Sequence, residues 1–398
     1  MNEKNIEARI QEIFNNFNNK NYEIVIDECL NLIRLNYKIP ILYNLLGTVF
    51  TFKNEYEKSL EYYLQGVNLD PDNEEFHRNI GKNYLFLKKY TNAEKEFLTA
   101  IKIKKTNPDS LLHLGIIYLE TKNEKKAIQF LEKSLQFNPL STESFYNLGL
   151  CHKNLGDFKK AIEYYKKAIK SNLNHLKSYN NLGVCYLAIN DYKNALDILT
   201  KCLDINPEYS HALNNLGSVN LALKKYSEAE INFTNAYTLN KNLITAGIQK
   251  IFLKRKKCDW SSENEITELM CNSISIDAEA IPWQCLGMED NPKNHLIRAK
   301  KYSNKFKLKS HNNNVYKNSK IRLGYFASDF YQHAGMINML GIFKNHNKKN
   351  YEIIGLYYGD IKKDKMHNKI KKYFDEFYYV ENLSDEQIAK FANKIELT

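Results

Sequence analysis

Six glycines recur at one constant interval, and this spacing constrains the fold more than any other feature of the 398-residue chain. An apolar residue stands before each glycine, and a small residue follows twelve positions later. A fixed period of this length predicts a stack of similar units, each burying its apolar face against its neighbours. The glycines are Gly47, Gly81, Gly115, Gly149, Gly183 and Gly217, and the small residues are Ser59, Ala93, Ala127, Ala161, Ala195 and Ala229.

The interval and the residues around each glycine are typical of the tetratricopeptide repeat, a pair of antiparallel helices. A large side chain comes four residues after the small one in several units, as at Tyr63 and Tyr165. The glycine and the small residue allow the two helices to approach closely, and the aromatic side chains fill the space between successive units. We therefore expect Ala161 and Ala195 to be almost fully buried between helices.

The expected fold is mostly α-helical: a right-handed tetratricopeptide-repeat superhelix, a connecting helical segment and a partial α/β, Rossmann-like lobe. We assign residues 1–39 to a degenerate N-terminal cap repeat and 40–243 to six repeats of this period. The period is lost beyond this point, so 244–319 are assigned to connecting helices and a linker. Residues 320–398 alternate short apolar runs with helical runs, which is typical of a parallel sheet with helices on its faces.

A column of asparagines provides the candidate peptide-binding groove. In these repeats the first helix of each pair lines the concave face. The position two residues before the glycine is asparagine in four of the six units. Amide side chains donate and accept hydrogen bonds, so this column is suited to the backbone of an extended peptide. Alternatively, asparagine is common in this chain and is tolerated on an exposed helix face. The four residues are Asn79, Asn147, Asn181 and Asn215.

The composition limits the kinds of partner and the cellular compartment that we expect for this chain. The net charge of +11 invites a nucleic-acid partner, but only six of the 57 basic residues are arginines, so we expect a lysine-rich solvated surface and no specific nucleic-acid site. The seven cysteines include no CxxC pair, which favours reduced thiols in the cytoplasm and no metal site. No apolar run reaches the ~18 residues of a membrane span, so no membrane partner is expected.

Two passages carry a more specific signal. The chain reads KCDW at 257–260, a Pro-Trp pair at 282–283 and KIRLGYFASDFYQHAGMINML from Lys320 onward. Between them, helical spacing relates His295, Leu296, Ala299 and Tyr302. These passages resemble the connecting segment and the first catalytic strand and loop of protein O-GlcNAc transferases, the family that includes the SPINDLY-like proteins.

The resemblance implies an enzyme. Members of that family place such repeats ahead of two Rossmann-like lobes, and residues 320–398 correspond to the start of the first lobe. They transfer a sugar, usually N-acetylglucosamine from UDP-N-acetylglucosamine, to serine or threonine of protein acceptors. The family uses no cofactor and no catalytic metal, so none is expected here.

The resemblance also implies a candidate catalytic residue, His333, which matches the histidine of the family's first loop. That histidine faces sugar and acceptor and is a candidate general base. Ser328, Asp329 and Phe330 match the preceding motif, with Asp329 as a supporting group. The alternative is that Asp329 caps a turn and His333 starts a surface helix. His295, His346 and His367 match no family role and are expected to be surface or helix residues.

The sequence lacks the family's second lobe, which supplies most contacts to uridine and diphosphate. We therefore expect the 398-residue chain to be an incomplete enzyme that transfers no sugar by itself. The alternative function is a non-catalytic repeat scaffold that binds a peptide or partner protein. The donor-binding residues remain unassigned.

Overall fold

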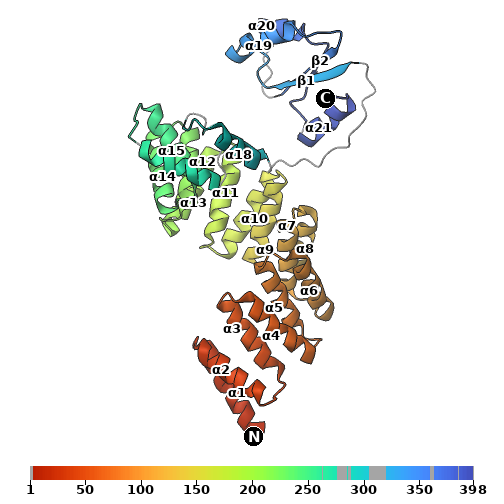
Figure 1. Ribbon diagram of the computed structural model, residues 1–398, viewed down its shortest axis with the longest axis vertical. Helices are drawn as coiled ribbons and strands as arrows, with labels where there is room; N and C mark the ends of the chain where they lie inside the picture. The colour runs from red at the N-terminus through yellow and green to blue at the C-terminus, as the bar shows by residue number, and fades with distance from the viewer. Residues whose placement is uncertain are drawn as a thin grey trace. The chain divides into compact units, whose positions relative to one another are not determined.

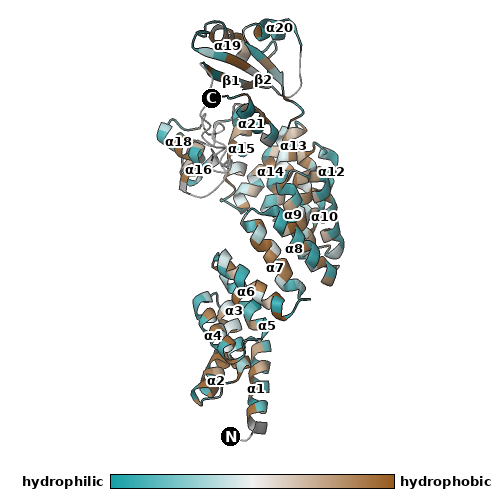
Figure 2. Cartoon of the chain, turned by 90° about the vertical axis from the view of Figure 1, so that its right-hand side faces the viewer, coloured by the Kyte–Doolittle hydropathy of each residue, from teal (hydrophilic) through white to brown (hydrophobic). Residues whose placement is uncertain are grey.

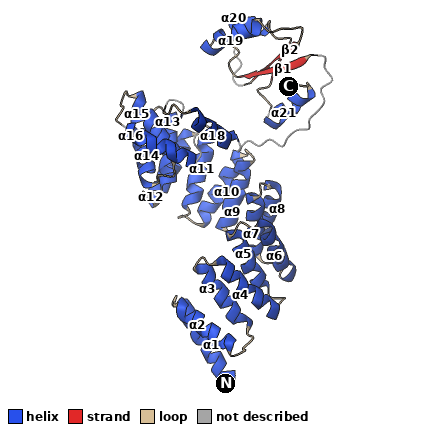
Figure 3. Ribbon diagram, in the orientation of Figure 1, coloured by secondary structure: helices blue, strands red, loops and turns tan. Residues whose placement is uncertain are grey.

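The computed structural model describes residues 3–261, 263–275, 285, 288–303, 320–358, 363–383 and 385–397. It divides the chain into two units, Met1–Phe306 and Lys307–Thr398. The described part of the first unit is helical, and the described strands lie in the second (Figure 3). The expected Pro-Trp pair at 282–283 and the linker residues 304–319 lie outside the described residues.

The first unit is a succession of antiparallel helix pairs (Figure 1). Each helix packs on its partner and on the next pair, and most helices carry both hydrophilic and hydrophobic residues, as Figure 2 shows. The first helices are α1 (Glu3–Asn18), α3 (Pro40–Phe52), α5 (Glu74–Phe86), α7 (Pro108–Glu120), α9 (Thr142–Asn154), α11 (Leu176–Ala188), α13 (Ser210–Ala222) and α15 (Ile244–Lys256). The second helices are α2 (Tyr22–Arg34), α4 (Tyr56–Leu69), α6 (Tyr90–Ile103), α8 (Glu124–Phe137), α10 (Phe158–Ser171), α12 (Tyr192–Ile205), α14 (Tyr226–Leu239) and α16 (Glu263–Ser275).

The recurring glycines are explained by one repeated contact. Each lies against a large side chain sixteen residues later on the second helix of its own pair. A Cβ atom added to Gly149 would lie 2.6 Å from the ring of Tyr165, and one on Gly47 would lie 2.5 Å from the ring of Tyr63. Ala161 and Ala195 are 0% exposed, which confirms the expected burial of the small residues.

A second feature with the period of the glycines is visible only in the backbone. A residue shortly after the first helix of each pair adopts the left-handed conformation, with φ between 56° and 77°. These residues are Lys20, Asn54, Lys88, Lys122, Gly156, Asn190, Lys224 and Cys258. The helical period therefore extends through α1–α2 at one end and α15–α16 at the other. At both ends an isoleucine occupies the glycine position, and Ile13 and Ile251 are buried.

Lysine at a left-handed position predicts a simple stabilising substitution. This conformation costs a non-glycine residue about 1–2 kcal/mol. Glycine avoids this cost, but its greater conformational freedom in the unfolded chain offsets part of the gain. Lys122 is exposed and has φ 57°. We expect Lys122→Gly to stabilise the array by about 0.5–1 kcal/mol in urea unfolding followed by circular dichroism.

The matched control is Gly156→Ala, at the same position of the next pair. An added Cβ there would meet nothing within 4 Å, so its effect is purely conformational. The expected change is a destabilisation of about 1 kcal/mol. Shifts of the same sign in both variants would contradict this explanation.

A buried arginine fixes the last described helix of the first unit, α18 (Pro292–Ser303), to α16. Arg298 is 1% exposed and forms an ion pair with Glu289 at 2.6 Å. Its guanidinium donates hydrogen bonds to Ser273 Oγ at 2.7 Å and to the carbonyl oxygen of Met270 at 3.1 Å. This cluster holds the connecting segment on the end of the array.

The second unit contains a three-stranded parallel sheet of order β1-β2-β3. The alternation of strands and helices expected for 320–398 is therefore present. A cluster of buried aromatic rings, including Phe330, Phe343 and Tyr357, forms its core. The elements are β1 (Ile321–Ala327), α19 (Ala334–Lys344), β2 (Tyr351–Tyr357), α20 (Lys365–Lys371), β3 (Glu376–Tyr379) and α21 (Asp385–Lys394).

Candidate functional site

The asparagine column lies on the first helices, but its amides are largely used between neighbouring pairs. The Nδ2 of Asn79 donates to Asn44 Oδ1 at 3.1 Å, and that of Asn215 donates to Asn180 Oδ1 at 2.8 Å. Asn181 donates to the hydroxyl of Tyr146 at 3.3 Å. These three partners lie on the preceding first helix, and Asn181 also donates to the carbonyl oxygen of Lys177 on its own helix at 3.0 Å. The first three bonds tie successive pairs together.

The expectation that all four asparagines face a ligand requires correction at Asn147. Its side chain is only 6% exposed, and its Nδ2 donates to the carbonyl oxygen of Glu143 at 2.8 Å. Asn181 is further occupied by Lys153, whose Nζ donates to its Oδ1 at 3.0 Å. Of the four asparagines, only Asn79 lines either of the two hollows described below.

One hollow, the α3–α5 hollow, lies between the first helices of two successive pairs and has a volume of about 460 Å³. Phe52 and Phe86, each the last residue of its helix, are 56% and 58% exposed. The ring of Phe86 also stacks on Tyr56, with centroids 4.9 Å apart. The lining residues are Thr48, Thr51, Phe52, Asn54, Tyr56, Tyr63, Asn79, Lys82 and Phe86.

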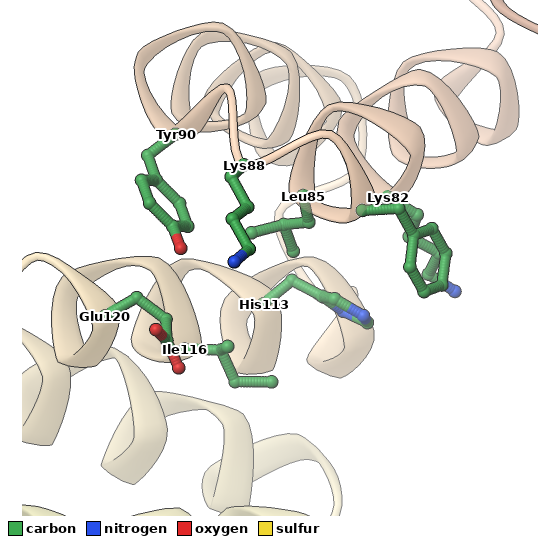
Figure 4. A pocket seen from close by; sticks show the side chains of 8 residues that line it. Lys82, Leu85, Lys88, Tyr90, His113, Ile116 and Glu120 are labelled. Atoms are coloured by element: carbon green, nitrogen blue, oxygen red, sulfur yellow. The ribbon is translucent and has the colours of Figure 1, made fainter. Parts of the chain in front are cut away.

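The next hollow along the array, the α5–α7 hollow, has a volume of about 540 Å³ and shares Lys82 and Phe86 with the first. Figure 4 shows Lys88, from the α5–α6 connection, and Tyr90, at the start of α6, extending toward α7. The lining residues are Lys82, Leu85, Phe86, Lys88, Tyr90, His113, Ile116 and Glu120. The two hollows therefore form adjacent sites on the first-helix face.

Within the described part of the chain, some charged groups around the α5–α7 hollow are paired with one another and Lys88 is not. Asp109 lies 2.6 Å from Lys82 and 3.3 Å from His113. Burial opposes its ionisation, but the hydrogen bonds and charges of His113 and Lys82 outweigh burial and hold the pKa of Asp109 well below its ordinary value. Lys88 forms no ion pair within 4.0 Å among the described residues, so its ammonium remains available to a ligand.

Sequence reasoning missed the aromatic walls of these hollows. Phe52 and Phe86 are one period apart, as are Tyr56 and Tyr90. The signal was present, but the same aromatic residues are also suited to a buried helix interface. Only their exposure in the structure distinguishes a binding surface from a core.

In the second unit, His333 is the residue before α19 and its Nδ1 accepts a hydrogen bond from the backbone N–H of Gly335 at 3.2 Å. Its Nδ1 also lies 3.2 Å from Asp329 Oδ2. Both side chains are partly exposed and follow the carboxyl end of β1, where ligands of open parallel sheets bind. Phe330, fully buried, anchors the loop that carries them.

His367 lies in helix α20, as one of the two expected placements allowed, but it does not lie on the surface. It is almost completely buried, with Nδ1 2.8 Å from the carbonyl oxygen of Phe330 and Nε2 3.0 Å from the hydroxyl of Tyr379. These contacts join the loop after β1 to β3. His346 pairs through Nε2 with the hydroxyl of Tyr325 at 2.6 Å.

The described residues lack two kinds of feature. No group of three or more histidine, cysteine or carboxylate side chains there is placed to hold a metal ion. Among the described helices, none has the length and apolar character needed to cross a membrane.

Family models match several parts of the repeat region. Residues 47–85 match the TPR repeat, and 76–107 and 210–243 match the tetratricopeptide repeat. Residues 120–202 match subunit 3 of the anaphase-promoting complex, or cyclosome. These matches identify the helix pairs within residues 47–243 as tetratricopeptide repeats. No curated protein matches the chain.

Solved structures of repeat proteins are similar in fold. A chain of the APC/C hetero-tetramer Cut9–Hcn1 is 16% identical, with a TM-score of 0.51 over 58% of this chain and 46% of that one. A tetratricopeptide repeat protein from Parabacteroides merdae is also 16% identical, with a TM-score of 0.50 over 62% of this chain and 98% of that one. The present chain thus covers less than half of the Cut9–Hcn1 chain.

The chain therefore carries a mostly helical tetratricopeptide-repeat solenoid followed by a small parallel sheet. Repeats of this class commonly present extended binding surfaces to peptides and partner proteins.

Proposed function

We propose that the chain is a repeat scaffold that binds an extended segment of a partner protein across the α3–α5 and α5–α7 hollows. The observation that supports this best is the pair of adjoining hollows with half-exposed Phe52 and Phe86 at their walls. Exposed aromatic rings at the rim of a hollow are typical of binding surfaces, where aromatic residues carry much of the affinity.

The polar groups of the hollows suit a peptide rather than a purely apolar ligand. Lys88 and Glu120 offer opposite charges on facing sides of the α5–α7 hollow, and Asn79 offers amide groups to the α3–α5 hollow. An extended peptide presents side chains and unpaired backbone groups at short intervals. It can therefore satisfy both the apolar walls and the polar groups of two neighbouring hollows.

Removing the ring shared by the two hollows should weaken binding strongly. Burying a phenylalanine side chain contributes about 1.5–3 kcal/mol, so Phe86→Ala should reduce affinity by roughly tenfold or more. The test selects random nonapeptides displayed on phage against the full chain and measures the best binders by fluorescence anisotropy.

The matched control is Ile231→Ala on α14. Ile231 is 60% exposed, nearly the same as Phe86, but lies on a second helix away from both hollows. It should bind the selected peptides as the unaltered chain does. Equal loss in both variants, or selection of no peptide at all, would contradict the proposed function.

We further propose, as a second candidate, that the chain is part of a UDP-sugar:protein O-glycosyltransferase. The supporting observation is the placement of His333 and Asp329 beyond the carboxyl end of β1, at the start of α19. In this proposal the parallel sheet is the beginning of a Rossmann-like lobe. His333 contacts sugar or acceptor as a candidate base, and the repeats hold the protein acceptor.

The second candidate predicts a requirement for a second lobe. The 398-residue chain should bind UDP-N-acetylglucosamine poorly in calorimetry and transfer no radiolabelled sugar, because nothing in it matches the family's contacts to uridine and diphosphate. A longer version with a second lobe should transfer sugar, and His333→Ala should abolish most of that transfer. His211→Ala, an exposed histidine on α13, is the control. Full activity of the His333 variant would exclude its catalytic role.

A further inference from the structure

We propose that the α3–α5 hollow is a specificity pocket for an aromatic side chain that donates a hydrogen bond, tyrosine or tryptophan, in the bound segment. This inference rests on the proposed function as a peptide-binding scaffold and adds the chemistry of one bound residue. It follows from the hydrogen-bond directions at the floor of the hollow and from the rings at its walls.

At the floor of the α3–α5 hollow, the hydroxyl protons of Thr48 and Tyr63 are directed to acceptors of the protein and not to a ligand. The Oγ1 of Thr48 donates to the carbonyl oxygen of Asn44 at 2.8 Å and lies 3.0 Å from the hydroxyl of Tyr63. A hydroxyl has a single proton, so when Thr48 directs its proton to Asn44, the bond between the two hydroxyls is donated by Tyr63. Tyr63 lines the hollow although it is only 2% exposed, and its hydroxyl oxygen keeps lone pairs that its own proton does not use.

Thr51 is held in the same way. Its Oγ1 lies 2.9 Å from the carbonyl oxygen of Gly47, 2.8 Å from Ser59 Oγ and 3.1 Å from Asn83 Oδ1. The hydroxyl of Ser59 donates to Gly47 at 2.6 Å and accepts from Asn83 at 2.6 Å. This buried network consumes the proton of Thr51 and leaves a second acceptor oxygen beneath the hollow.

Acceptors therefore predominate over donors at the floor. The donors are an amide hydrogen of Asn79 and the ammonium of Lys82, whose charge is balanced by Asp109 at 2.6 Å. A ligand carboxylate would face these oxygens unfavourably. A ligand phenyl ring would displace the water from these oxygens and offer no hydrogen bond in its place, which costs free energy at each unsatisfied acceptor. A hydroxyl or indole N–H satisfies them.

The walls select the aromatic ring that carries this donor. The half-exposed rings of Phe52 and Phe86 and the ring of Tyr56 border the hollow. Aromatic pairs add attraction beyond the area that they bury. A volume of about 460 Å³ accommodates one large side chain with its flanking backbone. An amphipathic ring with a polar tip thus matches both parts of the site.

The experiment compares nonapeptide pools with random flanks and a fixed central residue, Tyr, Trp, Phe, Leu or Glu, for binding to the full chain by fluorescence anisotropy. The Tyr and Trp pools should bind at least fivefold more tightly than the Phe, Leu and Glu pools. Tyr63→Phe removes one floor acceptor while keeping the ring that packs on Gly47, and should reduce the Tyr-over-Phe preference to less than twofold.

The matched control is Tyr165→Phe. Tyr165 packs on Gly149 as Tyr63 packs on Gly47, and its buried hydroxyl has no hydrogen-bond partner among the described residues. This variant should keep the full preference for Tyr. If Tyr63→Phe does not fold, Thr48→Val provides the second test, because it removes the acceptor of the Tyr63 proton and turns that proton toward the ligand. The Tyr preference should again fall below twofold.

Three results would overturn the inference. The Phe or Leu pool binding as tightly as the Tyr pool would show that the floor does not select a donor. An unchanged Tyr preference in a folded Tyr63→Phe or Thr48→Val variant would place the selection elsewhere. Either result leaves Phe86-dependent peptide binding, and with it the proposed function, intact. Failure of every pool to bind would overturn both.

Discussion

Arg298→Ala should destabilise the C-terminal end of the helical array by about 3–5 kcal/mol, the usual cost of removing one member of a buried ion pair. The substitution leaves Glu289 without its cation and the hydroxyl of Ser273 without its donor, and the carbonyl of Met270 keeps only the bond from Ser273 Oγ at 2.7 Å among these side-chain donors. Amide hydrogen exchange in α16 and α18 is the appropriate measurement, because the loss should be concentrated in these helices.

Lys300→Ala is the matched control on the same helix, since Lys300 is exposed. Its exchange rates should remain close to those of the unaltered chain. A change of less than about 0.5 kcal/mol for Arg298→Ala would place this residue among ordinary surface positions and would contradict its role as the anchor of α18.

The same pair gives a pH dependence with a defined sign. Burial opposes ionisation of Glu289, but the hydrogen bond from Asn294 and the charge of Arg298 together hold its pKa below the ordinary value. A lowered carboxylate pKa stabilises the folded state above the unfolded pKa of ~4.3, and this contribution is lost as the pH falls through the folded value. The difference between Arg298→Ala and the unaltered chain should therefore shrink below about pH 4.

The repeat array was predictable from sequence because its defining contact recurs within each unit. Gly149 and Tyr165 are separated by sixteen residues, and the same separation relates Gly47 and Tyr63. The prediction lost the period where that contact changes. At the N-terminal end Ile13 takes the glycine position, and the pair was still predicted as a degenerate cap repeat. At the C-terminal end Ile251 takes the glycine position, and the pair α15–α16 was missed until the left-handed residue at Cys258 showed that the period continues.

Periodicity places a residue on a helix face but does not determine its depth. Asn79 and Asn147 share a register position, yet Asn79 borders a hollow and Asn147 is buried. The helical spacing around Leu296 correctly indicated α18, but Leu296 is 55% exposed and Arg298 is buried instead. Buried charges are rare, so a sequence pattern predicts that the apolar side of a helix is the buried one. The ion-pair partner of Arg298, Glu289, is identified only by the three-dimensional structure.

Gly149→Ala is the second substitution with a large expected effect. In an open helix this change would stabilise by up to about 1 kcal/mol, because alanine has the higher helix propensity. Here the new Cβ would lie 2.6 Å from the ring of Tyr165, a fully buried side chain on the paired helix. Overpacking of this kind costs about 1–3 kcal/mol, so we expect a net destabilisation of about 1–2 kcal/mol in urea unfolding followed by circular dichroism.

Two controls separate overpacking from a general intolerance of alanine. An added Cβ at Gly341, within α19, would meet nothing within 4 Å, so Gly341→Ala should slow amide exchange in that helix. A double-mutant cycle with Tyr165→Ala isolates the contact itself. Tyr165→Ala alone opens a cavity and destabilises the array, but Gly149→Ala should cost nothing further in that background because the ring is gone. An undiminished cost there would show that the glycine serves the backbone rather than the close approach of the two helices, and the constant interval between the glycines would need another explanation.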